Sequence, residues 1–153
     1  MITTIGLVAC SKTKLNHAAP ARELYTSPLF RAASAYCERT YDRWFILSAK
    51  HGLVDPDQIL EPYDLTLSDL DRRLLRTWGT QVRTQWQRTG ISTVAVGQGW
   101  SKRGDDDIRF FMHAGRLYRT SASFRADLVE APVERLRIGE QIAWYAAQSG
   151  GAS

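Results

Sequence analysis

Continuous apolar runs alternate with amphipathic stretches along this chain. Strand-like runs cover residues 3–9, 43–49 and 92–97 and, less clearly, residues 126–131. Three of these runs are continuously apolar rather than alternating, which is typical of strands covered on both faces of a sheet.

Amphipathic helix patterns lie between the strand-like runs. The first offers Ser27 as N-cap and Pro28 at the first helical position, followed by an apolar stripe up to Thr40. The second starts at Ser68 and ends at Gly90.

Two shorter helices are expected further along the chain. One falls within residues 108–125, and the other follows the "RIG" segment at 137–139 and covers residues 140–148. Strands that alternate with helices predict βαβ units. The expected fold is therefore α/β: a single-domain, three-layer Rossmann-like sandwich with a mainly parallel sheet of about four to five strands. The domain is expected over residues 1–148, with a disordered tail over 149–153.

Composition and the first residues of the chain predict the cellular location of this domain. The chain has 153 residues, 44% of them hydrophobic, and no apolar run approaches the roughly 20 residues that a membrane-spanning helix needs. The apolar start lacks a basic leader, so a cytoplasmic protein without a membrane partner is expected. The two cysteines, Cys10 and Cys37, are expected to be reduced.

Positive charge is unevenly divided between the two basic residue types. The formal net charge is +4, with sixteen arginines and four lysines, which favours an anionic partner such as a phosphate or nucleic acid. The lysines follow the predicted strands, where ligands bind in open α/β sheets. They are Lys12, Lys14, Lys50 and Lys102.

The loop after the first strand reads "ACSKTK". Its hydroxyl and ammonium groups, on Ser11, Lys12 and Lys14, suit an anion. Cys10 is either a nucleophile activated by those lysines or a small residue that ends a strand. The loop lacks the glycine spacing of a phosphate-binding or dinucleotide-binding motif, so no cofactor is identified.

The loop after the second strand carries further candidates. Ser48, Lys50 and His51 follow the strand directly, and Gly52 permits a backbone conformation that other residues resist. His51 is either a general acid or base, because its pKa is ordinarily near neutrality, or a residue that hydrogen-bonds the loop.

The segment "EPYDLTL" continues this loop. Pro62 restricts Glu61 to an extended conformation and so directs its carboxylate. Tyr63 is suited to stack on a base or sugar, and Asp64 follows it. The alternative is that the segment is a lid closed over the core.

Other parts of the chain contribute single candidates. Tyr25, Gln98 and Arg116 are further candidates for binding the substrate. His113, by contrast, is expected at the surface. No cluster has metal-ligand spacing, so no metal site is expected.

The second helix pattern is rich in arginine. Arg72, Arg76 and Arg83 share one face at helical spacing, which favours either contact with a nucleic-acid backbone or a solvated basic face.

The stretch "ILSAKHGLVDPDQILEPYDLTL" resembles the central signature of the YaaA family of peroxide-stress proteins. The "CSKTK" loop is also similar to a segment of that family, and a weaker likeness is to the core domain of archaeosine synthase. The resemblance implies an α/β domain with a pocket and a connection to nucleobase modification. The matching positions are Ser48, His51, Gly52, Leu53, Pro56, Ile59, Pro62 and Tyr63.

Together these features predict a hydrolase or transferase that acts on a nucleotide, nucleoside or modified nucleobase at the carboxyl edge of the sheet. The catalytic candidates are Cys10, Lys50, His51 and Glu61. The alternative is a non-catalytic, nucleic-acid-binding stress-response protein.

Overall fold

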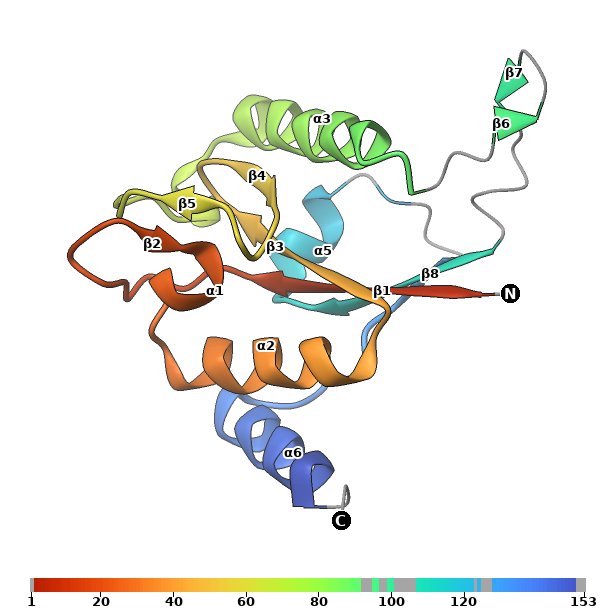
Figure 1. Cartoon of the computed structure of the whole chain (residues 1–153). Helices are drawn as coiled ribbons and strands as arrows, with labels where there is room; N and C mark the ends of the chain where they lie inside the picture. Colours follow the sequence, from red (N-terminus) through yellow and green to blue (C-terminus); the bar gives the residue numbers. More distant parts are fainter. Residues whose placement is uncertain are drawn as a thin grey trace.

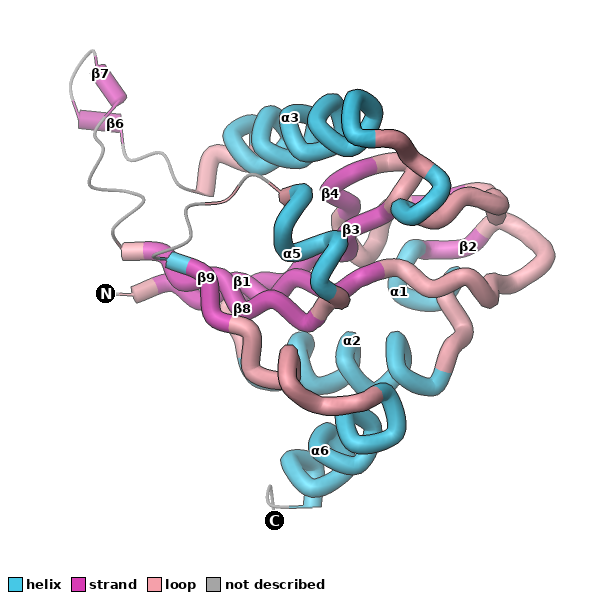
Figure 2. Tube along the Cα trace, turned by 180° about the vertical axis from the view of Figure 1, so that it is seen from behind, coloured by secondary structure: helices cyan, strands magenta, loops and turns pink. Residues whose placement is uncertain are grey.

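The chain forms one mostly parallel sheet with helices on both sides (Figures 1 and 2). The structure is a computed structural model that describes residues 2–91, 95–96, 99–100, 107–122, 124 and 128–150. The strand order of the sheet is β4-β3-β1-β8-β9. All neighbouring strands are parallel except β4, which pairs antiparallel with β3. The strands are β1 (Thr3–Ala9), β3 (Arg43–Ser48), β4 (Gly52–Val54), β8 (Ile108–His113) and β9 (Val129–Glu130).

Helices lie on opposite faces of this sheet. In Figure 1, α2 (Pro28–Thr40) and α6 (Ile138–Gly150) lie below the sheet, whereas α3 (Arg72–Arg88) and α5 (Arg116–Ser121) lie above it. The prediction of an α/β fold with a mainly parallel sheet is confirmed. Its assignment to a Rossmann-like three-layer class stays a prediction.

The smaller elements surround the loops at the carboxyl ends of β1 and β3. A two-stranded antiparallel ribbon joins β2 (Ala19–Pro20) to β5 (Ile59–Leu60), next to the short helix α1 (Ala21–Leu24). The 3₁₀ turn η1 (Leu67–Asp69) precedes α3.

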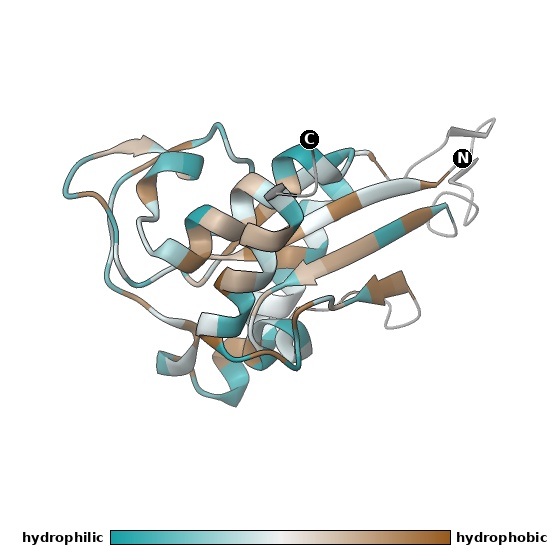
Figure 3. Cartoon of the chain, turned by 90° about the horizontal axis from the view of Figure 1, so that it is seen from below, coloured by the Kyte–Doolittle hydropathy of each residue, from teal (hydrophilic) through white to brown (hydrophobic). Residues whose placement is uncertain are grey.

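The central strand β1 forms because its side chains are buried on both faces. Ile5 and Leu7 belong to the core on the side of α3, whereas Val8 belongs to the core on the side of α2. The helices themselves are amphipathic, as Figure 3 shows from the side of α2 and α6. The continuous apolar run predicted this two-sided burial correctly.

The start of α2 is as the sequence predicts. Ser27 is the N-cap, and its hydroxyl oxygen accepts a hydrogen bond from the backbone N–H of Phe30 at 3.0 Å. The predicted start of the next helix was wrong. Ser68 lies in the 3₁₀ turn, and Asp71 is the N-cap of α3, where it accepts from the backbone N–H of Leu74. Thr66 and Asp69 form their own capping box, which separates the two elements.

The predicted helix within residues 108–125 was wrong in its first half. Residues 108–113 form β8, which pairs with β1 in the middle of the sheet. Ile108, Phe110 and Met112 are buried, whereas Arg109 and Phe111 are only partly buried. This alternation has the period of two that marks a strand. The second half contains the helix α5.

The predicted strands at 92–97 and 126–131 are only partly matched. Ala95–Val96 form β6, which pairs with β7 (Gly99–Trp100) in a separate two-stranded sheet. The rest of 92–97 lies outside the described residues. Within 126–131, Val129–Glu130 form β9 beside β8. At the other end of the domain, α6 extends through Gly150, two residues beyond the predicted end of the domain.

None of the helices in the described ranges is long and apolar enough to cross a membrane. Both Cys10 and Cys37 are free thiols.

Candidate functional site

The predicted site residues of the first two loops meet at the carboxyl ends of β1 and β3. These strands are adjacent and parallel, so their carboxyl ends reach the same edge of the sheet. The backbone N–H of Cys10 donates to the carbonyl of Leu47 at 3.0 Å, which ties the start of the first loop to the end of β3.

Three hydroxyl groups form a hydrogen-bonded chain at this edge. The Tyr63 hydroxyl lies 2.6 Å from Ser48 Oγ and 2.7 Å from the Tyr25 hydroxyl. Ser48 and Tyr25 are fully buried. Burial raises the pKa of Tyr25 to about 12 and also raises the pKa of Tyr63. The chain is therefore protonated at neutral pH, and it fixes the Tyr63 ring against the core.

Lys14 lies over the ring that this chain holds. Its Nζ is 4.4 Å from the centre of the Tyr63 ring and 5.7 Å from that of Tyr25. Burial lowers the pKa of Lys14, while Cys10 and Asp64 act in the opposite direction. Lys14 Nζ donates to the carbonyl of its neighbour Lys12 at 3.2 Å. This ammonium group is therefore only partly solvated, which strengthens its attraction for an anion.

Lys50 approaches the same ring from the second loop. Its Nζ is 5.8 Å from the centre of the Tyr63 ring, although the side chain is exposed. Two ammonium groups from different loops thus share one aromatic ring, as favourable cation–π geometry allows. Asp64 is exposed beside them.

Cys10 joins this cluster from the end of β1. Its Sγ lies 3.2 Å from the hydroxyl of Tyr118, which comes from α5. Burial raises the pKa of Tyr118, and the charge of Cys10 adds to that effect. Cys10 also acts on the pKa of Lys14 and Tyr63, so the thiol lies within electrostatic range of both.

The turn at His51 and Gly52 is held in place by hydrogen bonds with a side chain of α3. Gln85 Nε2 donates to the carbonyl of His51 at 2.8 Å, and Gln85 Oε1 accepts from the backbone N–H of Leu53 at 2.7 Å. Gly52 has a φ of 74°, and a Cβ at this position would collide with Gln85 Oε1. Only glycine fits this turn without strain.

The His51 ring faces the cluster. It packs edge to face against Tyr63 with ring centres 5.4 Å apart, and its backbone N–H donates to Ser48 Oγ at 3.0 Å. Burial and the neighbouring charge of Lys50 both lower the pKa of His51. Its imidazole is therefore neutral at physiological pH and able to accept a proton.

The remaining predicted residues that the structure describes are exposed or form hydrogen bonds within their own loop. Lys12 and Glu61 are exposed, and Ser11 Oγ donates to the carbonyl of Thr13 at 2.7 Å. Arg116 is exposed at the first position of α5. Gln98 and Lys102 lie outside the described residues.

A small cavity of about 80 Å³ lies at the carboxyl ends of β1 and β8, where residues of α2 and α6 also line it. The chain passes from β1 to β3 on one side and later returns to β8 on the other side of β1, so this is the switch point at which open α/β sheets bind ligands. Of the four catalytic candidates, its lining includes Cys10 but not Lys50, His51 or Glu61. The cavity is lined by Val8, Ala9, Cys10, Ser27, Leu29, Phe30, Ala33, His113, Ala114, Gly115, Gln141 and Tyr145.

The surface position expected for His113 was wrong. The side chain is 5% exposed, and its two ring nitrogens lie 2.6 Å from the Tyr41 hydroxyl and 2.7 Å from the Tyr145 hydroxyl. Burial lowers its pKa to about 4. The sequence pattern does not indicate this burial, because the alternation of β8 would place His113 on the same face as the partly buried Arg109 and Phe111.

The functional residue that sequence reasoning placed least well is Tyr118. It is not among the predicted site residues, yet its hydroxyl contacts the Cys10 thiol, 108 positions earlier in the chain. No local pattern indicates this contact. Within the described ranges, no group of three or more His, Cys, Asp or Glu side chains could hold a metal ion.

Comparison with known proteins supports one family. Residues 5–147 match DUF6884, described as a family of unknown function. The chain is also 30% identical over 95 residues to the uncharacterized protein YfjM of Bacillus subtilis (strain 168). That match covers 58% of this chain and 62% of the relative, so the chain spans less than two thirds of the relative's length. No solved structure matches.

These matches correct the resemblance to the YaaA family. The family that matches is DUF6884, no match to the YaaA family is found, and the YaaA assignment was wrong. The stress-response part of the alternative function depended on that resemblance and is withdrawn with it, as is the connection to archaeosine synthase. The match extends over nearly the whole chain, including both loops of the candidate site, and the chain therefore belongs to the DUF6884 family.

Proposed function

We propose that this protein is an enzyme that binds a nucleotide, nucleoside or modified nucleobase at the carboxyl edge of β1 and β3, and acts on it by hydrolysis or group transfer. The observation that carries the proposal is the position of Lys14. Its ammonium group lies 4.4 Å from the centre of the Tyr63 ring, within electrostatic range of the Cys10 thiol. A cation, an aromatic ring and a nucleophile thus share one site.

Binding would use the two kinds of group that a nucleotide presents. Lys14 and Lys50 would hold the phosphate, with Lys12 at the exposed margin. The rings of Tyr63 and His51 would pack against the base, while Asp64 would accept hydrogen bonds from ribose or base. The chain from Ser48 to Tyr25 keeps the Tyr63 ring in one orientation, which favours binding by preorganisation.

Chemistry would fall to the groups nearest this ring. Cys10 is the candidate nucleophile and His51 the candidate base, because its lowered pKa keeps it unprotonated at neutral pH. In hydrolysis of an N-glycosidic bond, His51 would accept a proton from the attacking water. The C–N bond would break, the sugar would take the hydroxyl, and His51 would return the proton to the leaving base. Glu61 remains a second candidate for proton transfer.

A cytoplasmic location, where nucleotides are abundant, is part of the proposal. The two free thiols are compatible with a reducing compartment.

Calorimetry with the four ribonucleoside monophosphates and their nucleosides tests the binding step. Lys14→Met removes the charge and keeps much of the apolar stem, so it should weaken monophosphate binding at least 10-fold and nucleoside binding less. The matched control is Arg39→Met, an exposed cation in the last turn of α2 at the opposite edge of the sheet. The proposal fails if no compound binds below 1 mM, or if both variants weaken binding equally.

Activity separates an enzyme from a binding protein. With the bound compound as substrate, Cys10→Ser and His51→Asn should each slow product formation at least 10-fold. Cys10→Ser should leave affinity within about 3-fold, whereas His51→Asn also removes a ring that packs against the base and should weaken binding. Turnover that neither variant changes would exclude both residues from the chemistry.

A further inference from the structure

The outer face of α3 carries positive charge that the proposed chemistry does not use. The helix spans Arg72–Arg88 and contains no aspartate or glutamate. All of its arginines are exposed, and within the described part of the chain none forms an ion pair. These five residues are Arg72, Arg73, Arg76, Arg83 and Arg88.

Most of the remaining exposed surface of α3 is polar as well, although Leu74 is 48% exposed. Its surface is hollowed between Arg76 and Arg88, with threonines and glutamines as the other lining residues. These two arginines are twelve positions apart in the sequence, which places them about 18 Å apart along the helix axis. The apolar side of α3, with Trp78, Val82 and Trp86, is buried in the core. Arginines spaced along a helix, with hydroxyl and amide groups between them, provide hydrogen-bond donors for successive phosphates of a nucleic-acid chain.

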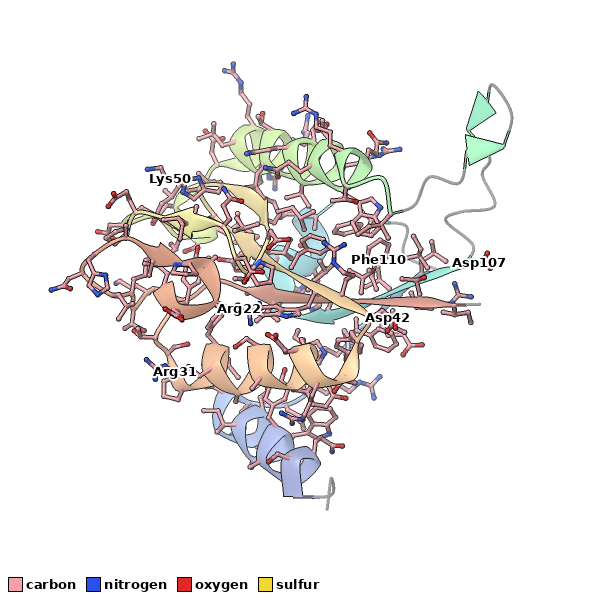
Figure 4. All side chains as sticks on the ribbon, viewed as in Figure 1. Arg22, Arg31, Asp42, Lys50, Asp107 and Phe110 are labelled. Atoms are coloured by element: carbon pink, nitrogen blue, oxygen red, sulfur yellow. The ribbon has the colours of Figure 1, made fainter. Side chains whose placement is uncertain are left out.

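This basic face is fixed next to the candidate site. Gln81 and Gln85, which line the hollow on α3, also donate to the carbonyl of His51. Trp78 Nε1 donates to the carbonyl of Ser48 at 2.8 Å. Figure 4 shows Lys50 on the same side of the sheet as α3, with Arg31 on the opposite side. The helix α3 and its arginines therefore lie on the same side of the sheet as Lys50 and the turn at His51.

We propose that the outer face of α3 is a docking surface for single-stranded nucleic acid, which it holds by the phosphate backbone. The arginines supply the charge, and the nearby His51 and Tyr63 rings are placed to meet unstacked bases, which a duplex does not offer. An anionic membrane fits less well, because membrane-surface helices expose the apolar side that α3 buries. Docking goes beyond the proposed reaction and stands without it.

The test is fluorescence anisotropy with labelled 20-nucleotide single strands of DNA and RNA, measured from 50 to 300 mM salt. The test variant is Arg76→Gln, Arg83→Gln and Arg88→Gln together, because glutamine has similar helix propensity. The control variant changes Arg31, Arg39 and Arg137 to Gln, which are exposed residues on the side of α2 and α6. Both variants lose the same net charge, and circular dichroism checks that both are folded.

We expect the α3 variant to bind at least 10-fold more weakly at 100 mM salt, and the control within about 2-fold of the unchanged protein. The slope of log affinity against log salt should fall by about 2 in the α3 variant, because each phosphate contact to a single strand contributes about 0.7. Equal loss in both variants would overturn the proposal by assigning binding to overall charge.

Two further binding measurements distinguish single-stranded nucleic acid from a duplex and from an anionic membrane. Tighter binding of a duplex of the same sequence would overturn the single-stranded occupant. Binding to vesicles of phosphatidylcholine and phosphatidylglycerol that requires the same arginines, without oligonucleotide binding, would overturn nucleic acid altogether. Lys14→Met should leave α3 docking within about 3-fold, whereas the α3 variant should leave monophosphate binding unchanged. Failure of the proposed site and failure of docking are therefore separate results.

Discussion

Mild acid should destabilise this fold through His113. The side chain is buried, with one ring nitrogen 2.6 Å from the Tyr41 hydroxyl and the other 2.7 Å from the Tyr145 hydroxyl. A neutral imidazole has one donor and one acceptor, so one tyrosine donates to it and the other accepts from it. Protonation would place two donors and a charge in the core. Burial accordingly lowers the pKa of His113 from 6.5 to about 4.

The size of the effect follows from these two pKa values. Between about pH 6.5 and pH 4 the unfolded chain holds more protons than the folded protein, so the free energy of unfolding decreases as the pH falls through this window. The full difference corresponds to about 3 kcal/mol, at about 1.36 kcal/mol for each pKa unit. By pH 5 about 2 kcal/mol of this is lost.

Urea unfolding followed by tryptophan fluorescence at pH 7.5 and pH 5.0 measures this loss. We expect the unchanged protein to lose about 2 kcal/mol through this residue between the two pH values. His113→Asn should be less stable at both pH values, but its pH-dependent loss should be smaller by about that amount. His51→Asn is the matched control, because burial also lowers the pKa of His51, but its ring is only partly buried. The reasoning is refuted if His113→Asn keeps the full pH dependence.

Three further substitutions test single contacts. Gly52→Ala should cost about 2 kcal/mol and lower the Tm by roughly 5 °C in calorimetry, because of the positive φ and the collision with Gln85, and an unchanged Tm would contradict this. Tyr63→Phe should cost about 1–3 kcal/mol in urea unfolding, because two buried hydroxyls lose their shared partner. A cost below 0.5 kcal/mol would mean that the chain of hydroxyls rearranges. Asp71→Ala should cost about 1 kcal/mol and Ser68→Ala less than about 0.5 kcal/mol, and the reverse order would place the start of α3 at Ser68.

Much of the fold could be predicted because its signals are local. The first strand is a continuous apolar run, and the helix after it has a serine cap followed by proline, so the bounds of β1 and α2 agree with prediction. The segment from Ile108 to His113 misled because it is a short apolar run. Helix and strand are difficult to separate over such lengths unless the period of two is counted.

Only part of the candidate site could be predicted from the sequence in this way. Loops after adjacent parallel strands must meet at one edge, so the proximity of Cys10 to the region of Ser48 follows from strand order. Which hydroxyl meets which does not follow. Tyr63 bonds a residue 38 positions away, and Cys10 contacts one 108 positions away.

The sequence by itself therefore determined the α/β class, the two loops that carry the candidate site residues, and the abundance of arginine in the helix that becomes α3. These depend on periodicity, capping and spacing within a few turns of chain. Only the tertiary structure decided that Tyr118 lies against the thiol, that His113 is buried between two tyrosines, and that Lys14 lies over the ring of Tyr63. Those contacts depend on how distant segments pack against the same sheet, and a side chain carries no local mark of the partner that packing will bring to it.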